Sequence, residues 1–124
     1  MNNSARMLIA LISLVLAPLG LAADAGGKWT ASFETPIGTQ NYNYEFQVKG
    51  TTLTGTIKSN MLGEAKLENG KVEGSKVSFV EKASYQGMDL VITYSGEIAG
   101  NDEIRFSRDV AGFGTEALVA KRSK

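Results

Sequence analysis

The feature that most constrains this chain is a series of short segments in which apolar residues alternate with polar ones. The first segment, Gly27–Phe33, contains the only tryptophan of the chain, and Trp29, Ala31 and Phe33 fall at every second position. This period is typical of a β-strand with one buried face. Similar segments recur about every 8–12 residues between glycine-rich turn signals, which is the spacing of a β-sandwich or a β-barrel.

The alternation predicts eight strands and almost no helix, because no segment places apolar residues at helical spacing between helix caps. The predicted strands are Lys28–Thr35, Thr39–Lys49, Thr52–Ser59, Glu64–Glu73, Lys76–Lys82, Met88–Ala99, Glu103–Arg108 and Thr115–Arg122. We interpret Asn69-Gly70 as a β-bulge inside the fourth strand rather than as a hairpin turn. One extra residue there would bring Leu67 and Val72 to the same face of the strand.

The connections between these strands alternate in their predicted length. Those after the second, fourth and sixth strands are tight glycine turns, whereas the others are expected to be longer, among them Ala83–Gly87 and Asp109–Gly114. In an up-and-down meander the two sets lie at opposite ends. Eight strands without an uncovered edge indicate closure into a small antiparallel barrel. The fold class is therefore all-β, an eight-stranded up-and-down barrel with a long-loop mouth.

The first 25 residues have the pattern of a secretory signal peptide. Arg6 precedes an apolar run, Met7–Leu21, and small residues follow that run. The run is shorter than the roughly 20 residues that a membrane-spanning helix needs. We therefore expect residues 26–124 to be a single periplasmic or secreted domain that is not attached to a membrane. The predicted cleavage positions are after Ala25, which we prefer, Ala22 or Ala23.

The composition excludes several classes of function. The chain has no cysteine and no histidine, so no disulfide can form and the usual general base and metal ligand are both missing. Basic and acidic residues number thirteen each, and no basic run is present, which argues against nucleic acid and anionic membranes as partners. We expect a monomer that holds its fold by a packed core and has neither a metal nor a cofactor.

The residues at the two ends of the domain resemble a known family. Gly27-Lys28-Trp29 opens the first strand, and a basic residue, Arg122, ends the last one. This arrangement is similar to the calycins, that is, lipocalins and avidins, in which a tryptophan and an arginine close the barrel floor. The resemblance implies an eight-stranded barrel with Trp29 beside Arg122. The chain also resembles small exported bacterial β-domains, some of which accompany sugar-degrading enzymes.

The opposite end of the predicted barrel carries the candidate site. Continuing the period of two places polar side chains inside the mouth, below an apolar rim. A few converging polar groups in an apolar pocket are typical of small-ligand sites. Arg108 is the expected anchor, because its planar fork can hold a carboxylate, a phosphate or vicinal hydroxyls. The candidate ligand-binding residues are Arg108, Glu81, Glu116, Tyr42, Tyr85 and Phe113.

Several alternatives remain open at this point. The first hypothesis is a non-catalytic protein that binds a small molecule or a glycan, but Arg108 could instead pair with Glu81 or Glu116 and only support the fold. Apolar loops could bind a protein partner or inhibit one. The two carboxylates could also serve a weak carbohydrate-active hydrolase, or an accessory domain to one. We expect binding rather than catalysis.

Overall fold

The structure, a computed structural model, describes residues 24–123. The signal peptide predicted for residues 1–25 therefore lies almost wholly outside the described residues. The strands are β1 (Gly27–Thr35), β2 (Gly38–Lys49), β3 (Thr52–Ser59), β4 (Gly63–Lys66), β5 (Glu68–Glu73), β6 (Lys76–Tyr85), β7 (Met88–Ala99), β8 (Glu103–Val110) and β9 (Gly114–Arg122). Residues 24–123 contain no helix, and hence none that could cross a membrane.

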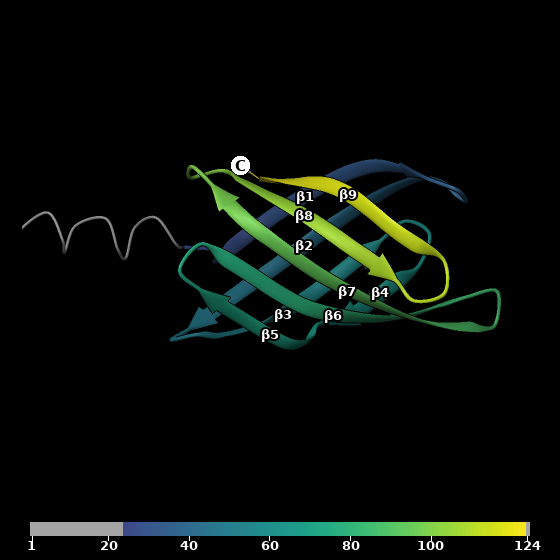
Figure 1. The fold of residues 1–124 in the computed structure, drawn as a ribbon, viewed down its shortest axis with the longest axis horizontal. Coiled ribbons are helices and arrows are strands. Elements are labelled where there is room, and N and C mark those ends of the chain that lie inside the picture. The colour runs from purple at the N-terminus through teal and green to yellow at the C-terminus, as the bar shows by residue number, and fades with distance from the viewer. Residues whose placement is uncertain (1–23, 124) are drawn as a thin grey trace, which may run out of the picture.

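The strands form one antiparallel sheet that closes on itself. The sheet order is β2-β1-β9-β8-β7-β6-β5-β3-β4, and an additional β2–β3 pairing completes the ring. Because β4 and β5 both pair with β3 and share one position in the wall, the barrel is eight-stranded, which confirms the predicted fold class. Figure 1 shows the barrel from the side, with the β1–β2, β6–β7 and β8–β9 hairpins at one end.

A register irregularity within β5 confirms the predicted bulge, although the predicted single strand Glu64–Glu73 is divided at Leu67 into β4 and β5. Glu68 is opposite Val80 and Lys71 is opposite Ser78, so β5 contains one residue more than β6 across this interval. Asn69 has a φ of 55°, in the left-handed region that asparagine tolerates better than most residues. The extra residue brings Leu67 and Val72 to the same side of the strand, and both side chains are buried.

The predicted difference in loop length between the two ends is wrong. β6 continues to Tyr85, which is opposite Met88, so the expected loop Ala83–Gly87 is a two-residue turn. Gln86 and Gly87 both have positive φ, 51° and 82°, as a tight hairpin turn of this kind requires. β1 and β2 are likewise joined by two residues only. The mouth is therefore formed by extended hairpins rather than by long loops.

Aromatic side chains fill the middle of the barrel. Rings of Tyr44, Phe79, Tyr94 and Phe106 contact one another, and the closest pair, Phe79 and Tyr94, has ring centroids 4.3 Å apart. Gly96 is opposite Phe106 on the neighbouring strand, and a Cβ atom there would collide with the Phe106 ring. Aromatic rings therefore occupy the middle of the barrel.

Trp29 and Arg122 close the floor of the barrel, as the sequence predicts. Trp29 is fully buried, and the Arg122 guanidinium carbon lies 4.3 Å from the centre of its ring. The indole N–H donates to the carbonyl of Ala25 over 3.0 Å, and the Ala25 side chain is itself fully buried. Cleavage after Ala25 would remove this contact, whereas cleavage after Ala22 or Ala23 would leave it in place.

The closure of the ring is short. β1 and β9 are paired only at Trp29↔Arg122 and Thr30↔Lys121, next to the floor, with one further hydrogen bond from the Ser123 amide to the Lys28 carbonyl. By contrast, each pair of consecutive strands from β6 to β9 is in register over eight residue pairs or more. The barrel is thus closed by its first and last strands at one end of their length.

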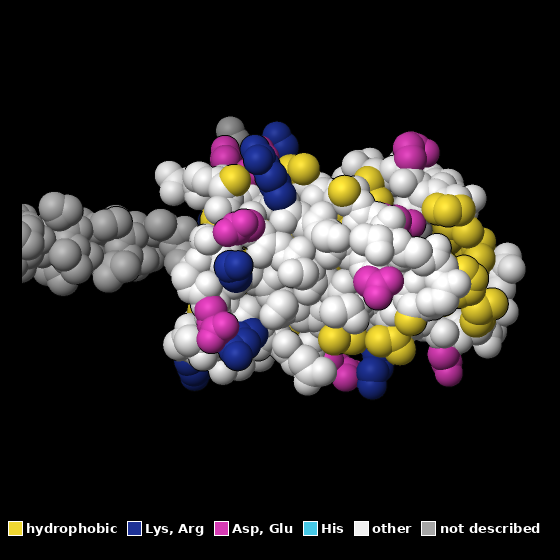
Figure 2. Space-filling view, in the orientation of Figure 1, with side chains coloured by type: hydrophobic (Ala, Val, Ile, Leu, Met, Phe, Trp, Pro, Cys, Tyr) yellow, Lys and Arg dark blue, Asp and Glu magenta, His cyan; other side chains and the backbone are white. Residues whose placement is uncertain are grey.

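The surface of the two ends differs in character. Figure 2 shows hydrophobic side chains gathered at the end where the β1–β2, β6–β7 and β8–β9 hairpins lie, while most Lys and Arg side chains on this face lie towards the opposite end. Three of the large hydrophobic residues that solvent reaches belong to these hairpins, namely Ile37, Met88 and Phe113, with Phe113 63% exposed. This end is the mouth of the barrel.

Candidate ligand-binding site

A cavity of about 430 Å³ opens at the mouth. This volume lies within the roughly 300–1,000 Å³ that is usual for small-ligand sites. The cavity is bounded by the β1–β2, β6–β7 and β8–β9 hairpins, by Leu62 of the β3–β4 connection and by the first inward-facing residues below them. Its lining residues are Thr35, Pro36, Ile37, Gln40, Leu62, Tyr85, Gln86, Met88, Leu90, Ile92, Arg108, Val110, Phe113 and Glu116.

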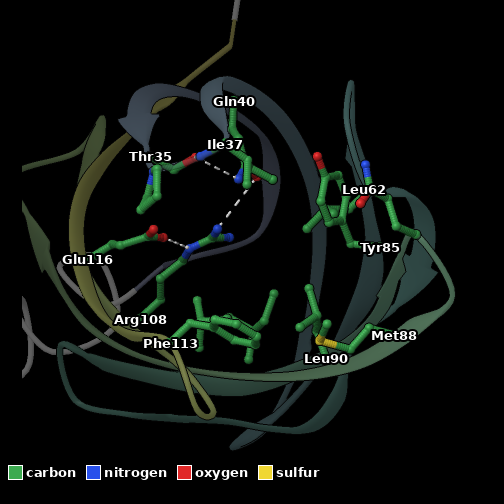
Figure 3. Close-up of a pocket in the computed structure, with 14 residues that line it drawn as sticks. Thr35, Ile37, Gln40, Leu62, Tyr85, Met88, Leu90, Arg108, Phe113 and Glu116 are labelled. Atoms are coloured by element: carbon green, nitrogen blue, oxygen red, sulfur yellow. Dashed lines mark hydrogen bonds and ion pairs between the residues drawn. The ribbon is translucent and has the colours of Figure 1, made fainter.

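The lining has two chemically different sides, which Figure 3 shows facing each other. On one side Arg108, Glu116, Gln40 and Thr35 lie together and are joined by hydrogen bonds. On the other side are Leu62, Tyr85, Met88 and Leu90, from the β3–β4 connection and the β6–β7 hairpin. A molecule in this cavity would therefore meet a polar patch and an apolar wall at the same time.

The strand period explains why an arginine lies inside the barrel. Ile104, Phe106, Arg108 and Val110 occupy alternate positions of β8, and all four are buried. Arg108 is only 1% exposed. Its guanidinium carbon lies 4.8 Å from the ring centre of Phe33 and 5.1 Å from that of Tyr42. Aromatic faces attract cations, so these rings favour the buried charge.

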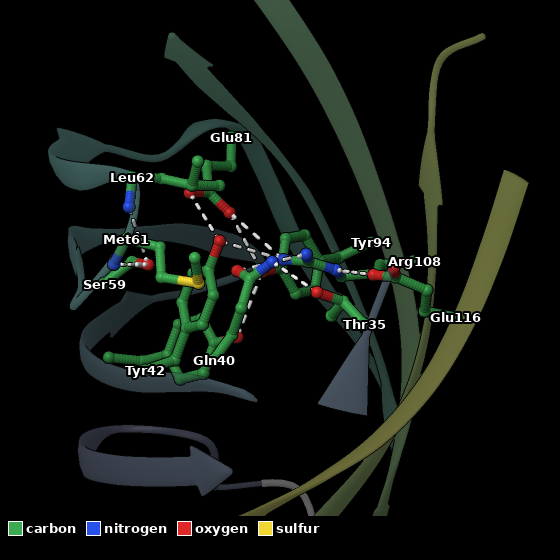
Figure 4. Close-up of polar contacts among 11 residues, drawn as sticks. Thr35, Gln40, Tyr42, Ser59, Met61, Leu62, Glu81, Tyr94, Arg108 and Glu116 are labelled. Atoms are coloured by element: carbon green, nitrogen blue, oxygen red, sulfur yellow. Dashed lines mark hydrogen bonds and ion pairs between the residues drawn. The ribbon is translucent and has the colours of Figure 1, made fainter. Parts of the chain in front are cut away.

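Side-chain acceptors surround the Arg108 guanidinium (Figure 4). Nε donates to Glu116 Oε1 over 2.8 Å, and Nη1 donates to the hydroxyls of Tyr42 and Tyr94 over 2.9 and 3.0 Å. Nη2 donates a longer hydrogen bond, 3.5 Å, to Gln40 Oε1. Buried charges require such partners, because desolvation otherwise costs more than the fold can supply.

Tyr42 and Tyr94 connect Arg108 to Glu81 through hydrogen bonds. Tyr42 donates to Glu81 Oε2 over 3.1 Å and Tyr94 donates to Glu81 Oε1 over 2.9 Å. The Tyr44 hydroxyl lies 3.0 Å from that of Tyr94. Since the Tyr94 proton is directed at Glu81, Tyr44 is the donor in this last contact. We call this group of Glu81, Tyr42, Tyr44, Tyr94 and Arg108 the buried network.

Burial shifts the pKa values of the buried network. Desolvation raises the pKa of Glu81, while the hydrogen bond from Tyr94, the charge of Arg108 and the hydrogen bond from Tyr42 oppose that rise. Desolvation also raises the pKa of Tyr42 to about 12 and that of Tyr44 well above its usual range. For Arg108, burial alone would lower the pKa, but Tyr94 and Tyr42 raise it. The guanidinium therefore stays charged.

The structure places the six predicted site residues at two depths. Arg108, Glu116, Tyr85 and Phe113 line the cavity. Tyr42 and Glu81 do not line it; they are each 1% exposed and contact Arg108 from below. The expected pairing of Arg108 with a carboxylate is present with both candidates, at 2.8 Å to Glu116 and 3.8 Å to Glu81.

Two side chains that contact Arg108 at this site, Gln40 and Tyr94, were not singled out from the sequence. Gln40 is 2% exposed and links Arg108 to Thr35, to which its amide donates over 3.1 Å. It falls in the same period of two as Tyr42 and Tyr44, so extending the alternation by one step towards the hairpin would have identified it. Tyr94 falls in the inward phase of β7, but its contacts with Arg108 and Glu81 depend on pairings between strands that are distant in the sequence.

The polar side of the cavity does not resemble a metal site. Among residues 24–123 no group of three or more histidine, cysteine, aspartate or glutamate residues lies close enough together to hold a metal ion. The two carboxylates nearest the cavity are already bridged by the Arg108 guanidinium, which occupies the position that a cation would take.

In comparisons with known proteins, no protein-family model, no curated protein and no solved structure matches this chain.

Proposed function

We propose that the protein binds a small, mainly apolar ligand in the mouth of the barrel and does not catalyse its conversion. The observation that carries this proposal is the cavity of about 430 Å³ with an apolar wall opposite a small polar patch. A glycan would need many hydrogen-bond partners, whereas most of the lining consists of aliphatic and aromatic residues. An apolar body with one polar end matches the cavity better.

The arrangement of the carboxylates favours binding over catalysis. Glycosidases need two carboxyl groups that both reach the substrate. Here Glu116 lines the cavity, but Glu81 is enclosed by the tyrosines of the buried network. The eight-stranded barrel and the Trp29–Arg122 floor are consistent with a calycin-like protein, and we include that kinship in the proposal.

A cavity-filling variant tests the proposal. Leu62→Trp should fill the mouth, and Val119→Trp, on the exposed outer wall, is the matched control. Small apolar and amphipathic compounds should shift the melting temperature and the methyl NMR signals of the wild type and of Val119→Trp, but not those of Leu62→Trp. Binding that is equal in all three proteins, or that is undetectable in the wild type, would contradict the proposal.

We further propose that the domain acts after export, in the periplasm or outside the cell. The burial of Ala25 and its hydrogen bond with Trp29 support processing after Ala22 or Ala23, because the mature domain would then keep its floor intact. The intact mass of the protein recovered from the periplasm or the medium tests this. A chain beginning at Gly26 would contradict the position, and an unprocessed cytoplasmic chain would contradict export.

The exposed apolar rim supports a second candidate function, the binding of a protein partner. Ile37, Met88 and Phe113 surround the cavity and are 37%, 50% and 63% exposed. Apolar surface concentrated in this way is typical of interaction sites. A photo-crosslinking residue at position 113 should then give a discrete adduct in the producing cell, while the same residue at position 119 should give none. Equal labelling from both positions would count against a partner.

A further inference from the structure

The polar patch of the cavity is better suited to a ligand that donates hydrogen bonds than to one that accepts them. Of the five N–H groups of Arg108, four already point to protein acceptors: Glu116, Tyr42, Tyr94 and Gln40. An incoming carboxylate or phosphate would have to displace at least one of these acceptors in order to be held by two hydrogen bonds. Arg108 was expected to anchor a carboxylate or phosphate, but most of its hydrogen-bond donors are already used by protein acceptors.

The charges around Arg108 also oppose an anion. Glu116 lies 2.8 Å and Glu81 3.8 Å from the guanidinium nitrogens, so two carboxylates face one cation. Both oxygens of Glu81 accept hydrogen bonds from tyrosine hydroxyls, which is the pattern of an ionised carboxylate. A negatively charged ligand group beside Arg108 would add a third negative charge. The two carboxylates would repel it in surroundings where that repulsion is weakly screened.

Glu116 is the side chain of the polar patch that can still accept hydrogen bonds. One of its oxygens accepts a hydrogen bond from Arg108, and the other accepts none from residues 24–123. Its side chain is 20% exposed and lines the cavity, in contrast to the 1% exposed Glu81. A carboxylate can accept about four hydrogen bonds, and those from a charged donor are roughly twice as strong as neutral ones.

We propose that Glu116, and not Arg108, is the anchor for the ligand's polar end, and that the ligand is an amphiphile with a hydrogen-bond-donating head, a primary amine in preference to a hydroxyl. This inference rests on the proposed function, since it names the class of ligand for the same cavity. Arg108 then has a positioning role: it holds one oxygen of Glu116 and leaves the other turned to the cavity. The apolar tail lies against Leu62 and Leu90.

Three probes of equal chain length test this directly: octylamine, octanol and octanoate, used at neutral pH below the micelle concentrations of the two ionic compounds and below the solubility limit of octanol. Binding is measured by NMR titration of the leucine and isoleucine methyl groups and by calorimetry. We expect the wild type to bind octylamine most tightly, octanol less tightly and octanoate least. In Glu116→Gln, octylamine binding should weaken about tenfold, the difference between a charged and a neutral hydrogen bond.

The remaining probes and a control variant separate a charge effect from general damage. Glu116→Gln keeps an oxygen for Arg108 Nε, so octanol should bind it nearly as well as the wild type, and octanoate should bind it better. Glu45→Gln, at an exposed position of β2, should leave all three affinities unchanged.

Each failure has its own reading. Octanoate binding to the wild type as tightly as octylamine, or equal loss of all three probes in Glu116→Gln, would overturn the assignment of the anchor and leave the cavity as a binding site. If none of the probes binds to the wild type, the proposed function itself is overturned, together with this inference.

Discussion

The two ends of the barrel each hold an arginine against an aromatic ring, but the partners of the two arginines differ. At the floor, Arg122 lies over Trp29 and donates to three backbone carbonyls, those of Asn101, Gly26 and Asp24. At the mouth, Arg108 lies against Phe33 and donates only to side chains. One arginine joins segments of the chain, and the other holds functional groups.

The difference follows from what each end has to do. Backbone carbonyls cannot change their orientation without moving the chain, so the contacts of Arg122 fix the ends of the domain against the β7–β8 turn. Side-chain acceptors can rotate, and Glu116 lines the cavity with one oxygen that accepts no hydrogen bond from residues 24–123. The floor is thus built for closure, whereas the mouth combines a buried charge with an open polar group.

The largest effect is expected at the floor. Trp29→Ala removes a fully buried ring and should lower the free energy of unfolding by about 3–5 kcal/mol, the usual cost of such a truncation. Urea denaturation followed by far-UV circular dichroism measures this loss. Trp29→Phe, which keeps a ring under Arg122 but loses the hydrogen bond to Ala25, should cost less. Equal losses in both variants would mean that the ring itself contributes little.

Loss of the mouth arginine should be nearly as severe. Arg108→Met leaves Glu81 buried without its cation and should cost about 3 kcal/mol at neutral pH, the lower end of the range for a broken buried pair. The lower end applies because Glu81 keeps two hydrogen bonds from tyrosines. Denaturation at neutral pH measures the difference. A loss of less than about 1 kcal/mol, typical of an exposed ion pair, would contradict the burial of this charge.

The same variant should respond to pH in a definite direction. Burial already raises the pKa of Glu81, and removal of the cation should raise it further. The folded protein then binds a proton that the unfolded chain releases, so stability is fully present below the ordinary carboxyl pKa and is lost as pH rises through the raised one. The gap between Arg108→Met and the wild type should therefore narrow as the pH is lowered towards 5, where denaturation is repeated. A gap that widens on acidification would contradict this account.

A smaller effect is expected for Arg122. Arg122→Ala removes hydrogen bonds to carbonyls and the contact with the Trp29 ring, and should cost about 1–2 kcal/mol. Arg105→Ala is the matched control, because that arginine is 70% exposed and pairs only with Glu103, so its loss should be barely measurable. Thermal unfolding of the two variants compares them, and equal shifts would remove the special role of the floor arginine.

The smallest effect on stability is expected at the rim. Phe113 is 63% exposed, so Phe113→Ala should change the free energy of unfolding by less than about 0.5 kcal/mol. The variant should nevertheless bind octylamine more weakly than the wild type, because it loses part of the cavity wall. Calorimetry on a variant with unaltered denaturation separates the two properties. Unchanged affinity would show that the rim lies outside the ligand's reach.

The fold could be predicted from the sequence because each strand repeats the same local signal. The alternation of Ile104, Phe106 and Arg108 predicts an inward arginine as directly as it predicts two inward hydrophobic residues. The bulge could be predicted for the same reason, since a single phase break between Leu67 and Val72 has few structural solutions. Loop lengths were harder to predict, because Gln86 adopts a positive φ and glutamine is not a residue type that indicates such a turn.

The site could be predicted only in part. Period and strand position identify which residues point into the mouth, but not how deep each of them lies. Whether Glu81 or Glu116 reaches the cavity depends on register: Arg108 is opposite Glu116 on β9 and opposite Tyr94 on β7, while Glu81 lies one strand further. These pairings join residues far apart in the chain, and no local pattern encodes them.

The short seam between β1 and β9 determines where this barrel should open first. A wall held by two residue pairs separates at lower cost than the β6–β7 hairpin, which is in register over ten. Amide hydrogen exchange should therefore be fast at the amides in the mouth-side halves of β1 and β9 that face the unpaired seam, and slow in the middle of β6 and β7. Such local opening would expose Phe33, which lies against Arg108. Solvent could then reach the cavity through the side wall of the barrel as well as through its mouth.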